Sequence, residues 1–169
     1  RGCKKVAIIN DKVVYGKALA DRAKAAIDAD KDSGIKVVLF AGVTAGQVSY
    51  DAVVSKLKNT GADVLLWGGY YNDASKLATQ MRSKQVNTVI VGADGLKNEG
   101  YVNMAGEAAE GTFATGPADF SQRANPPAAI PAPWEDLKKG HPTEEIGPSV
   151  SYTAAAMKAL FAAIEKPGR

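Results

Sequence analysis

Four short apolar runs, each ending abruptly in a polar or glycine-rich loop, most strongly constrain how this chain can fold. The runs cover residues 6–9, 37–40, 64–67 and 89–91. None of them alternates apolar with polar residues, which is typical of strands that are covered on both faces, as in a parallel sheet. Ligands of open parallel sheets bind at the carboxyl ends of the strands, so the loops after these runs are the first place to look for a site.

Segments with helical periodicity lie between the apolar runs. The spacing of apolar residues predicts helices over about residues 17–29, 49–60 (with Ser49 as N-cap) and 73–84. Their predicted buried faces include Leu19, Ala20, Ala23, Ala26 and Ile27, then Val53, Val54 and Leu57, and then Ala74, Leu77, Ala78 and Met81. Alternating strands and helices predict right-handed βαβ units. The predicted fold class is α/β, an open, mainly parallel sheet with helices on both faces.

The regular alternation weakens after residue 94. We expect a short helix at residues 101–105, one more strand at 111–115 and a final helix from about 148 to 164. Residues 117–148 are rich in proline, which forbids a continuous helix or central strand, so they predict an irregular connection with a short helix at 134–139. Residues 1–169 are therefore predicted to form a single α/β domain that contains this connection.

Composition and charge exclude several classes of protein. Hydrophobic residues make up 46% of the chain and charged residues 23%, as in ordinary globular domains, so disordered and fibrous classes are not expected. The net charge of +3 is spread along the chain with no basic stripe, and we predict no nucleic-acid partner. No apolar segment approaches the roughly 18 residues that span a bilayer, so direct membrane insertion is not expected. The single cysteine, Cys3, cannot form an internal disulfide.

Enzymatic motifs are missing from the sequence. It contains no phosphate-binding P-loop, no G-x-G-x-x-G after the first run, no G-x-S-x-G elbow and no H-E-x-x-H pair. His141, the only histidine, lies in a turn-like loop, so a surface position is favoured over a triad with Ser149 or Ser151. Carboxylates do not cluster at ligand spacing. We therefore predict neither enzymatic activity nor a metal or other cofactor.

Asp11 keeps a second class of protein open. It follows the first apolar run, where receiver-type signalling domains gather acidic residues around magnesium. The third run, however, ends in Trp67 and two glycines rather than in a phosphoacceptor aspartate. A doubly wound enzyme or a receiver-type signalling domain therefore remains only as an alternative.

The loops after the runs contain side chains suited to binding a small molecule. Tyr70 follows two glycines, which let the backbone approach a ligand while tyrosine offers a flat apolar face and a hydroxyl. Asp94 lies in a glycine-flanked loop, where a carboxylate could bind an ammonium group or merely cap a turn. Tyr15 and Thr44 lie in loops at the same edge. Tyr15, Tyr70 and Asp94 are the candidate ligand-binding residues, although either tyrosine could simply pack over a strand end.

Several short sequence words occur in the order and spacing of a known family. They are INDKVVYG at 9–16, GVTAG at 42–46, GGYY at 68–71, GADG at 92–95, AGEAAEG at 105–111 and YTAA at 152–155. From about residue 4 to 164, the chain resembles the second lobe of the leucine/isoleucine/valine-binding proteins. These are type I periplasmic solute-binding proteins that serve ABC importers.

The resemblance implies a non-enzymatic lobe that closes with a first lobe over a branched-chain amino acid. It assigns pocket-shaping roles to Tyr15 and Tyr70, and binding of the ligand's α-ammonium to Asp94. Branched-chain binders usually have glutamate in place of Asp94, so an amide, urea-like or aromatic solute remains an alternative. The resemblance also implies a precursor with a signal peptide, a periplasmic or membrane-tethered extracellular location, and an ABC permease as partner. Because nothing in the sequence resembles the first lobe, we expect little or no ligand binding by this chain alone.

Overall fold

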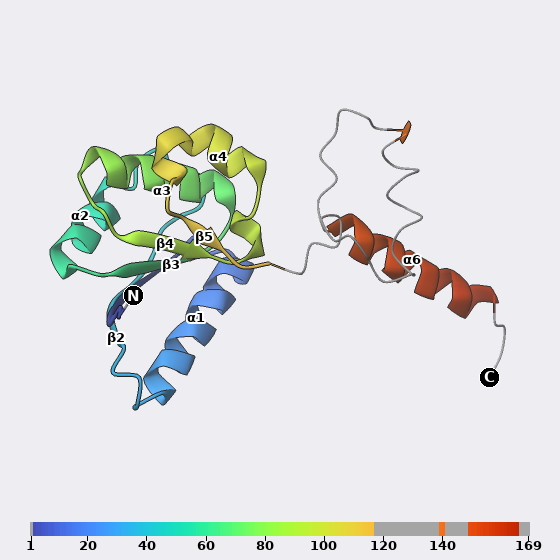
Figure 1. Ribbon diagram of the computed structural model, residues 1–169, viewed down its shortest axis with the longest axis horizontal. Helices are drawn as coiled ribbons and strands as arrows, with labels where there is room; N and C mark the ends of the chain where they lie inside the picture. The colour runs from blue at the N-terminus through green and yellow to red at the C-terminus, as the bar shows by residue number, and fades with distance from the viewer. Residues whose placement is uncertain (1, 117–138, 141–148, 166–169) are drawn as a thin grey trace. The chain divides into compact units, whose positions relative to one another are not determined.

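The computed structural model describes residues 2–116, 139–140 and 149–165 (Figure 1). The chain divides into two units, residues 1–116 and 117–169. In the second unit, α6 (Ser149–Glu165) corresponds to the final helix that the sequence predicts. Among the residues it exposes are Met157, Leu160, Phe161 and Ile164. The predicted irregular connection and its short helix lie outside the described residues except at 139 and 140, and His141 lies outside them as well.

A parallel sheet forms the centre of the first unit (Figure 1). Its strands are β1 (Lys5–Asn10), β2 (Lys36–Gly42), β3 (Val64–Gly68), β4 (Val89–Gly92) and β5 (Phe113–Ala114). They pair in the order β2-β1-β3-β4-β5, and every pair is parallel. This confirms the predicted open parallel sheet. From β1 the chain continues to β2 on one side of the sheet, and from β3 it continues to β4 on the other side. The strand order therefore reverses between β1 and β3.

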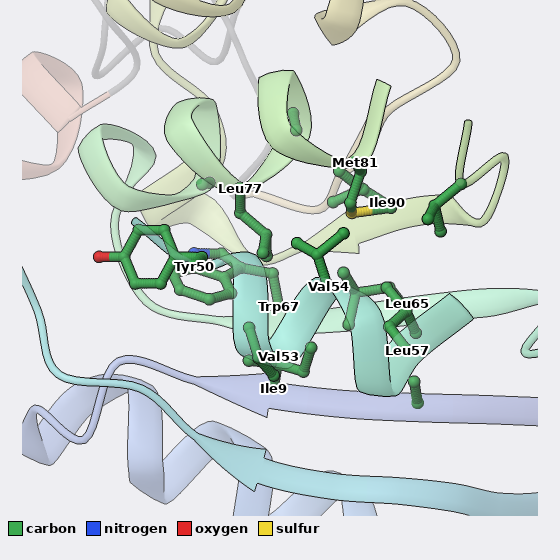
Figure 2. Close-up of a cluster of buried hydrophobic side chains, with 14 of the residues drawn as sticks. Ile9, Tyr50, Val53, Val54, Leu57, Leu65, Trp67, Leu77, Met81 and Ile90 are labelled. Atoms are coloured by element: carbon green, nitrogen blue, oxygen red, sulfur yellow. The ribbon is translucent and has the colours of Figure 1, made fainter. Parts of the chain in front are cut away.

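Helices cover both faces of the sheet, as predicted. On one face lie α2 (Asp51–Thr60), α3 (Tyr71–Ser83) and α4 (Glu99–Ala105), and on the other lies α1 (Val14–Ala29). The strands supply alternate residues to the two faces because successive side chains of a strand point in opposite directions. The larger cluster contains Ile9, Leu65 and Leu77 (Figure 2), whereas Ile8 packs towards α1.

Most of the predicted buried faces are confirmed. All the residues expected to be buried in α2 and α3 are buried. On α1, Ala20 is buried, but Ala26 is exposed, so that prediction was wrong. On the face of the sheet that carries α1, a groove of about 180 Å³ stays open, and its lining includes Leu19, Leu66 and Val91.

Local hydrogen bonds explain why helices begin at other residues than the sequence predicts. The first helix begins at Val14, three residues before Lys17, because Asp11 Oδ1 accepts the backbone N–H of Val13 and stabilises the turn before the helix. Tyr50, not Ser49, is the N-cap residue of α2, and its carbonyl accepts the N–H groups of residues 53 and 54. In addition, α3 begins at residue 71 and α4 at residue 99, each two residues early, and β5 contains only two residues of the predicted strand. A short 3-10 helix, η1 (Asp94–Leu96), and a second one, η2 (Gly106–Ala109), were not predicted.

Candidate functional site

The reversal of strand order determines where the loops gather. The loop after β1 leads into α1 on one face, and the loop after β3 leads into α3 on the other. In doubly wound sheets, such a reversal leaves room for a ligand at the carboxyl ends of the two strands. Tyr15 lies in the first turn of α1, Tyr70 is the N-cap residue of α3, and Asp94 begins η1 two residues after the end of β4.

The structure brings the three predicted residues together. The Tyr15 hydroxyl donates to Asp94 Oδ1 at 2.5 Å, across 79 residues of sequence. The Tyr15 and Tyr70 ring centroids are 5.2 Å apart and their planes are tilted by 31°, which is within the range of favourable aromatic contacts. The Tyr70 side chain is 48% exposed, and the backbone N–H of Gly95 lies 3.4 Å from the Tyr15 hydroxyl. The two tyrosine rings and the Asp94 carboxylate therefore lie side by side in one partly exposed cluster.

The Tyr15 hydroxyl stays protonated near neutral pH and so remains a hydrogen-bond donor. Burial, followed by the hydrogen bond to the Asp94 carboxylate, raises the pKa of Tyr15 to about 12. The phenol consequently keeps its proton and orients Asp94 Oδ1. The carboxylate can still accept a charge-assisted hydrogen bond from an ammonium group through its other oxygen.

Two other residues from the strand ends have different surroundings. Thr44 lies after β2, and β1 and β3 separate that strand from β4. Its side chain is exposed, and its carbonyl accepts from the Tyr50 hydroxyl at 3.4 Å. Asp11 is only 2% exposed, beneath the loops rather than on their surface. A surface magnesium site of the receiver type therefore does not fit Asp11.

A buried network supports the loop after β2, and sequence reasoning missed it. The Tyr50 hydroxyl donates to Asp73 Oδ1 at 2.7 Å, and the backbone N–H of Gly46 donates to the same oxygen at 3.0 Å. Burial and the Asp73 carboxylate raise the pKa of Tyr50. The acidic residue in the first turn of α3 is a helix signal, but nothing in the sequence links it to a tyrosine 23 positions away.

Removing the Tyr50 hydroxyl tests the strength of this network. We expect Tyr50→Phe to lower the free energy of unfolding by about 1.5 kcal/mol, because a buried carboxylate loses a charge-assisted donor but keeps the Gly46 amide. Urea unfolding followed by circular dichroism measures the change. Tyr101→Phe is the matched control, since its hydroxyl bonds the neutral Thr112 hydroxyl at 2.9 Å rather than a carboxylate, and it should cost less. Equal losses in the two variants would contradict a special contribution from Asp73.

Comparison with known proteins supplies the family. A model of the periplasmic binding protein family matches residues 1–168. The chain belongs to the periplasmic binding protein family. This confirms the resemblance drawn from the sequence words, and it accounts for the parallel sheet with helices on both faces.

Relatives in the periplasmic binding protein family carry related names. The chain is 36% identical to Leu/Ile/Val-binding protein homolog 3 of Brucella melitensis, covering 98% of this chain and 42% of that protein. It is 34% identical to the Leu/Ile/Val/Thr-binding protein of Salmonella typhimurium, covering 95% and 42% respectively. Among solved structures, LivJ of Streptococcus pneumoniae in complex with isoleucine aligns with a TM-score of 0.73 and 27% identity, covering 99% of this chain and 46% of that one.

These three proteins are named for the amino acids that they bind or for branched-chain amino-acid transport, and none of the three is named as an enzyme. The chain spans about 42% of the length of the curated relatives it matches. Within the described residues, no helix is long and apolar enough to cross a membrane. The same part of the chain holds no group of three or more histidine, cysteine or acidic residues placed to bind a metal ion.

Proposed function

We propose that this chain is one lobe of a periplasmic or membrane-tethered extracellular protein that binds a branched-chain or related amino acid for an ABC importer. The cluster of Tyr15, Tyr70 and Asp94 at the reversal of strand order carries this proposal. It combines an aromatic surface with a carboxylate, the groups needed for an apolar side chain and an α-ammonium. Relatives named for leucine, isoleucine and valine binding support the choice of ligand.

Each residue of the cluster has a separate role in this proposal. The free oxygen of Asp94 accepts the ligand's ammonium, while Tyr15 holds the other oxygen. The exposed Tyr70 ring, packed against the ring of Tyr15, covers the ligand's apolar part. A carboxylate one methylene shorter than glutamate reaches less far, so an amide, urea-like or aromatic solute is the second candidate for the same site.

A first lobe must complete the pocket. The three residues offer a carboxylate for an ammonium and aromatic rings for an apolar group. Neither kind of group is suited to binding a ligand carboxylate. The relatives are more than twice as long as this chain, so the first lobe of the parent protein is the expected source of that contact. The permease of the importer is the expected partner of the closed, loaded form.

Calorimetric titration of the intact parent protein tests the function. Leucine, other amino acids, short amides and nucleotides should be titrated separately, and we expect heat from at least one amino acid and none from nucleotides. Nucleotide binding without an amino-acid response would contradict the proposal and favour a doubly wound enzyme or signalling domain. Titration of the 169-residue chain with the same amino acids should give essentially no heat. Micromolar binding by this chain alone would contradict the need for a second lobe.

A further inference from the structure

Asp11 lies between the two segments that carry the aromatic pair. It directly follows β1, and its backbone N–H donates to the carbonyl of Gly68 at the end of β3 at 3.0 Å. Its Oδ1 accepts the backbone N–H of Val13 at 2.9 Å, immediately before α1. The residue is only 2% exposed. One short side chain thus contacts the helix start that carries Tyr15 and the strand end that leads to Tyr70.

Two glycines make this close contact possible. A Cβ atom on Gly16 would lie 2.3 Å from Asp11 Oδ1 and 2.3 Å from the carbonyl oxygen of Gly68. A Cβ atom on Gly69 would lie 2.6 Å from Asp11 Oδ2. Gly16 is the neighbour of Tyr15, and Gly69 is the neighbour of Tyr70. The carboxyl group of Asp11 therefore packs directly against the backbone next to each of the two tyrosines.

The second oxygen of Asp11 is buried and unpaired. Oδ2 is the one buried side-chain nitrogen or oxygen in the described residues that has no hydrogen-bond partner. A buried, unpaired charge is costly, so this environment favours the protonated carboxyl group. Burial is the main cause that raises the pKa of Asp11, and it outweighs the backbone amides of Val13, Tyr70 and Asp11 itself, which favour the charged form. The Tyr70 amide is near enough to lower the pKa, but it makes no hydrogen bond to Oδ2.

The charged and titratable groups around Asp11 do not neutralise it. From α3, the Asp73 carboxylate raises its pKa further. Tyr50, from the segment before α2, is the hydroxyl donor of Asp73, and its own pKa is raised by Asp11. On the loop of Asp11 itself, the exposed Lys12 lies across the position of Gly42, with Cγ and Cε 3.0 Å from where a Cβ of that glycine would be. None of the salt bridges in the described residues includes Asp11.

We propose that Asp11 is a positioning residue for the Tyr15–Tyr70 pair, and that loss of its proton loosens the loop carrying Tyr70 from the start of α1. Neutral Asp11 fits the tight space between the two glycines without an unpaired charge. Ionised Asp11 places a negative charge there, which favours any movement that admits water or a donor. The effect on ligand affinity rests on the proposed function, but the positioning of the rings does not.

The sign of the stability effect follows from the raised pKa. A carboxyl group whose pKa is higher in the folded protein than in the unfolded chain binds its proton more tightly when folded. Its stabilising contribution is complete below the unfolded value near 3.8 and is lost as pH rises through the folded value. Asp11→Asn keeps the shape and an acceptor for Val13 but cannot ionise. We expect this variant to have the higher melting temperature at high pH, with the difference disappearing as the solution is acidified.

Ring positions are measured most directly by nuclear magnetic resonance of the intact parent protein labelled with ¹³C at tyrosine Cζ. As the pH is raised from below the unfolded value near 3.8, we expect the Tyr15 and Tyr70 resonances to share one transition, and Asp11→Asn to abolish this shared transition. Asp51→Asn is the matched control, since Asp51 is exposed on α2, and it should leave the shift unchanged. A shared transition that persists in Asp11→Asn, or the absence of a shared transition in the parent, would overturn the proposal, whereas a change in Tyr15 alone belongs to its hydrogen bond with Asp94 and counts as no shared transition.

A second variant keeps the test decisive if Asp11→Asn does not fold. Asp73→Asn leaves Asp11 in place but removes the charge that raises its pKa, so the midpoint should move to lower pH. An unchanged midpoint would count against Asp11 as the titrating group. No ligand is added in these measurements, so failure of amino-acid binding in the calorimetric experiment and failure of the positioning role are separate results.

Discussion

Replacing Trp67 with alanine should lower the free energy of unfolding by about 3–5 kcal/mol, the usual cost of removing a buried tryptophan. Trp67 is on β3 and is 3% exposed within the larger core cluster (Figure 2). Its indole Nε1 also donates to the carbonyl of Tyr70 at 3.2 Å. The change therefore removes core packing and a direct hydrogen bond to the loop that carries a candidate ligand contact.

Urea unfolding followed by circular dichroism measures this loss, with two variants for comparison. Trp67→Phe keeps a large apolar ring but removes the N–H donor, so it should cost less than Trp67→Ala. The Tyr70 carbonyl then loses the indole donor and keeps the backbone N–H of Ala74 at 3.2 Å. Val48→Ala is the surface control, since Val48 is 90% exposed and its truncation should change stability by less than about 0.5 kcal/mol. If Trp67→Ala lowers the free energy of unfolding by less than about 1 kcal/mol, the tryptophan does not make a large packing contribution to the core.

Replacing Asp94 with asparagine should weaken amino-acid binding by the intact parent by about 1.5–3 kcal/mol, the range for a hydrogen bond to a charged group. This corresponds to a roughly 10- to 150-fold higher Kd, because every 1.4 kcal/mol is a factor of ten. Asparagine keeps an oxygen acceptor for the Tyr15 hydroxyl, so the change mainly removes the negative charge that the ligand's ammonium would meet.

Calorimetry with the amino acid that binds the parent most tightly measures the effect. Glu99→Gln is the matched control, because Glu99 is an exposed carboxylate in the first turn of α4, only five positions along the chain, and its loss should leave Kd unchanged. Asp94→Glu asks whether a carboxylate that reaches one methylene further binds the amino acid more tightly. Unchanged affinity in Asp94→Asn would remove this residue from the site.

The main elements of the fold could be predicted because their signals are local. Unbroken apolar runs identified β1 to β4, and apolar periodicity identified the buried faces of α2 and α3, including Leu57 and Leu77. Helix starts were harder because they depend on individual hydrogen bonds. The Asp11 carboxylate stabilises the turn before α1, and no apolar periodicity reports such a bond.

Convergence of the candidate site could also be predicted, but its connections could not. The carboxyl ends of parallel strands share one edge, so Tyr15, Tyr70 and Asp94 were expected to lie near one another. The Tyr15–Asp94 hydrogen bond depends on which loops are adjacent and on side-chain rotamers, neither of which a spacing of 79 residues reveals. The network of Tyr50 and Asp73 was missed for the same reason.

In the proposed site, the hydrogen bond from Tyr15 to Asp94 affects the entropy of ligand binding as well as its chemistry. A free carboxylate side chain on a surface samples several rotamers, and fixing a side chain on binding typically costs about 0.5–1.5 kcal/mol. Here the protein itself restricts Asp94, through a phenol whose pKa of about 12 keeps the donor in place near neutral pH. In the proposed site, Tyr15 therefore raises the affinity for the ligand's ammonium by fixing the position of its acceptor in advance.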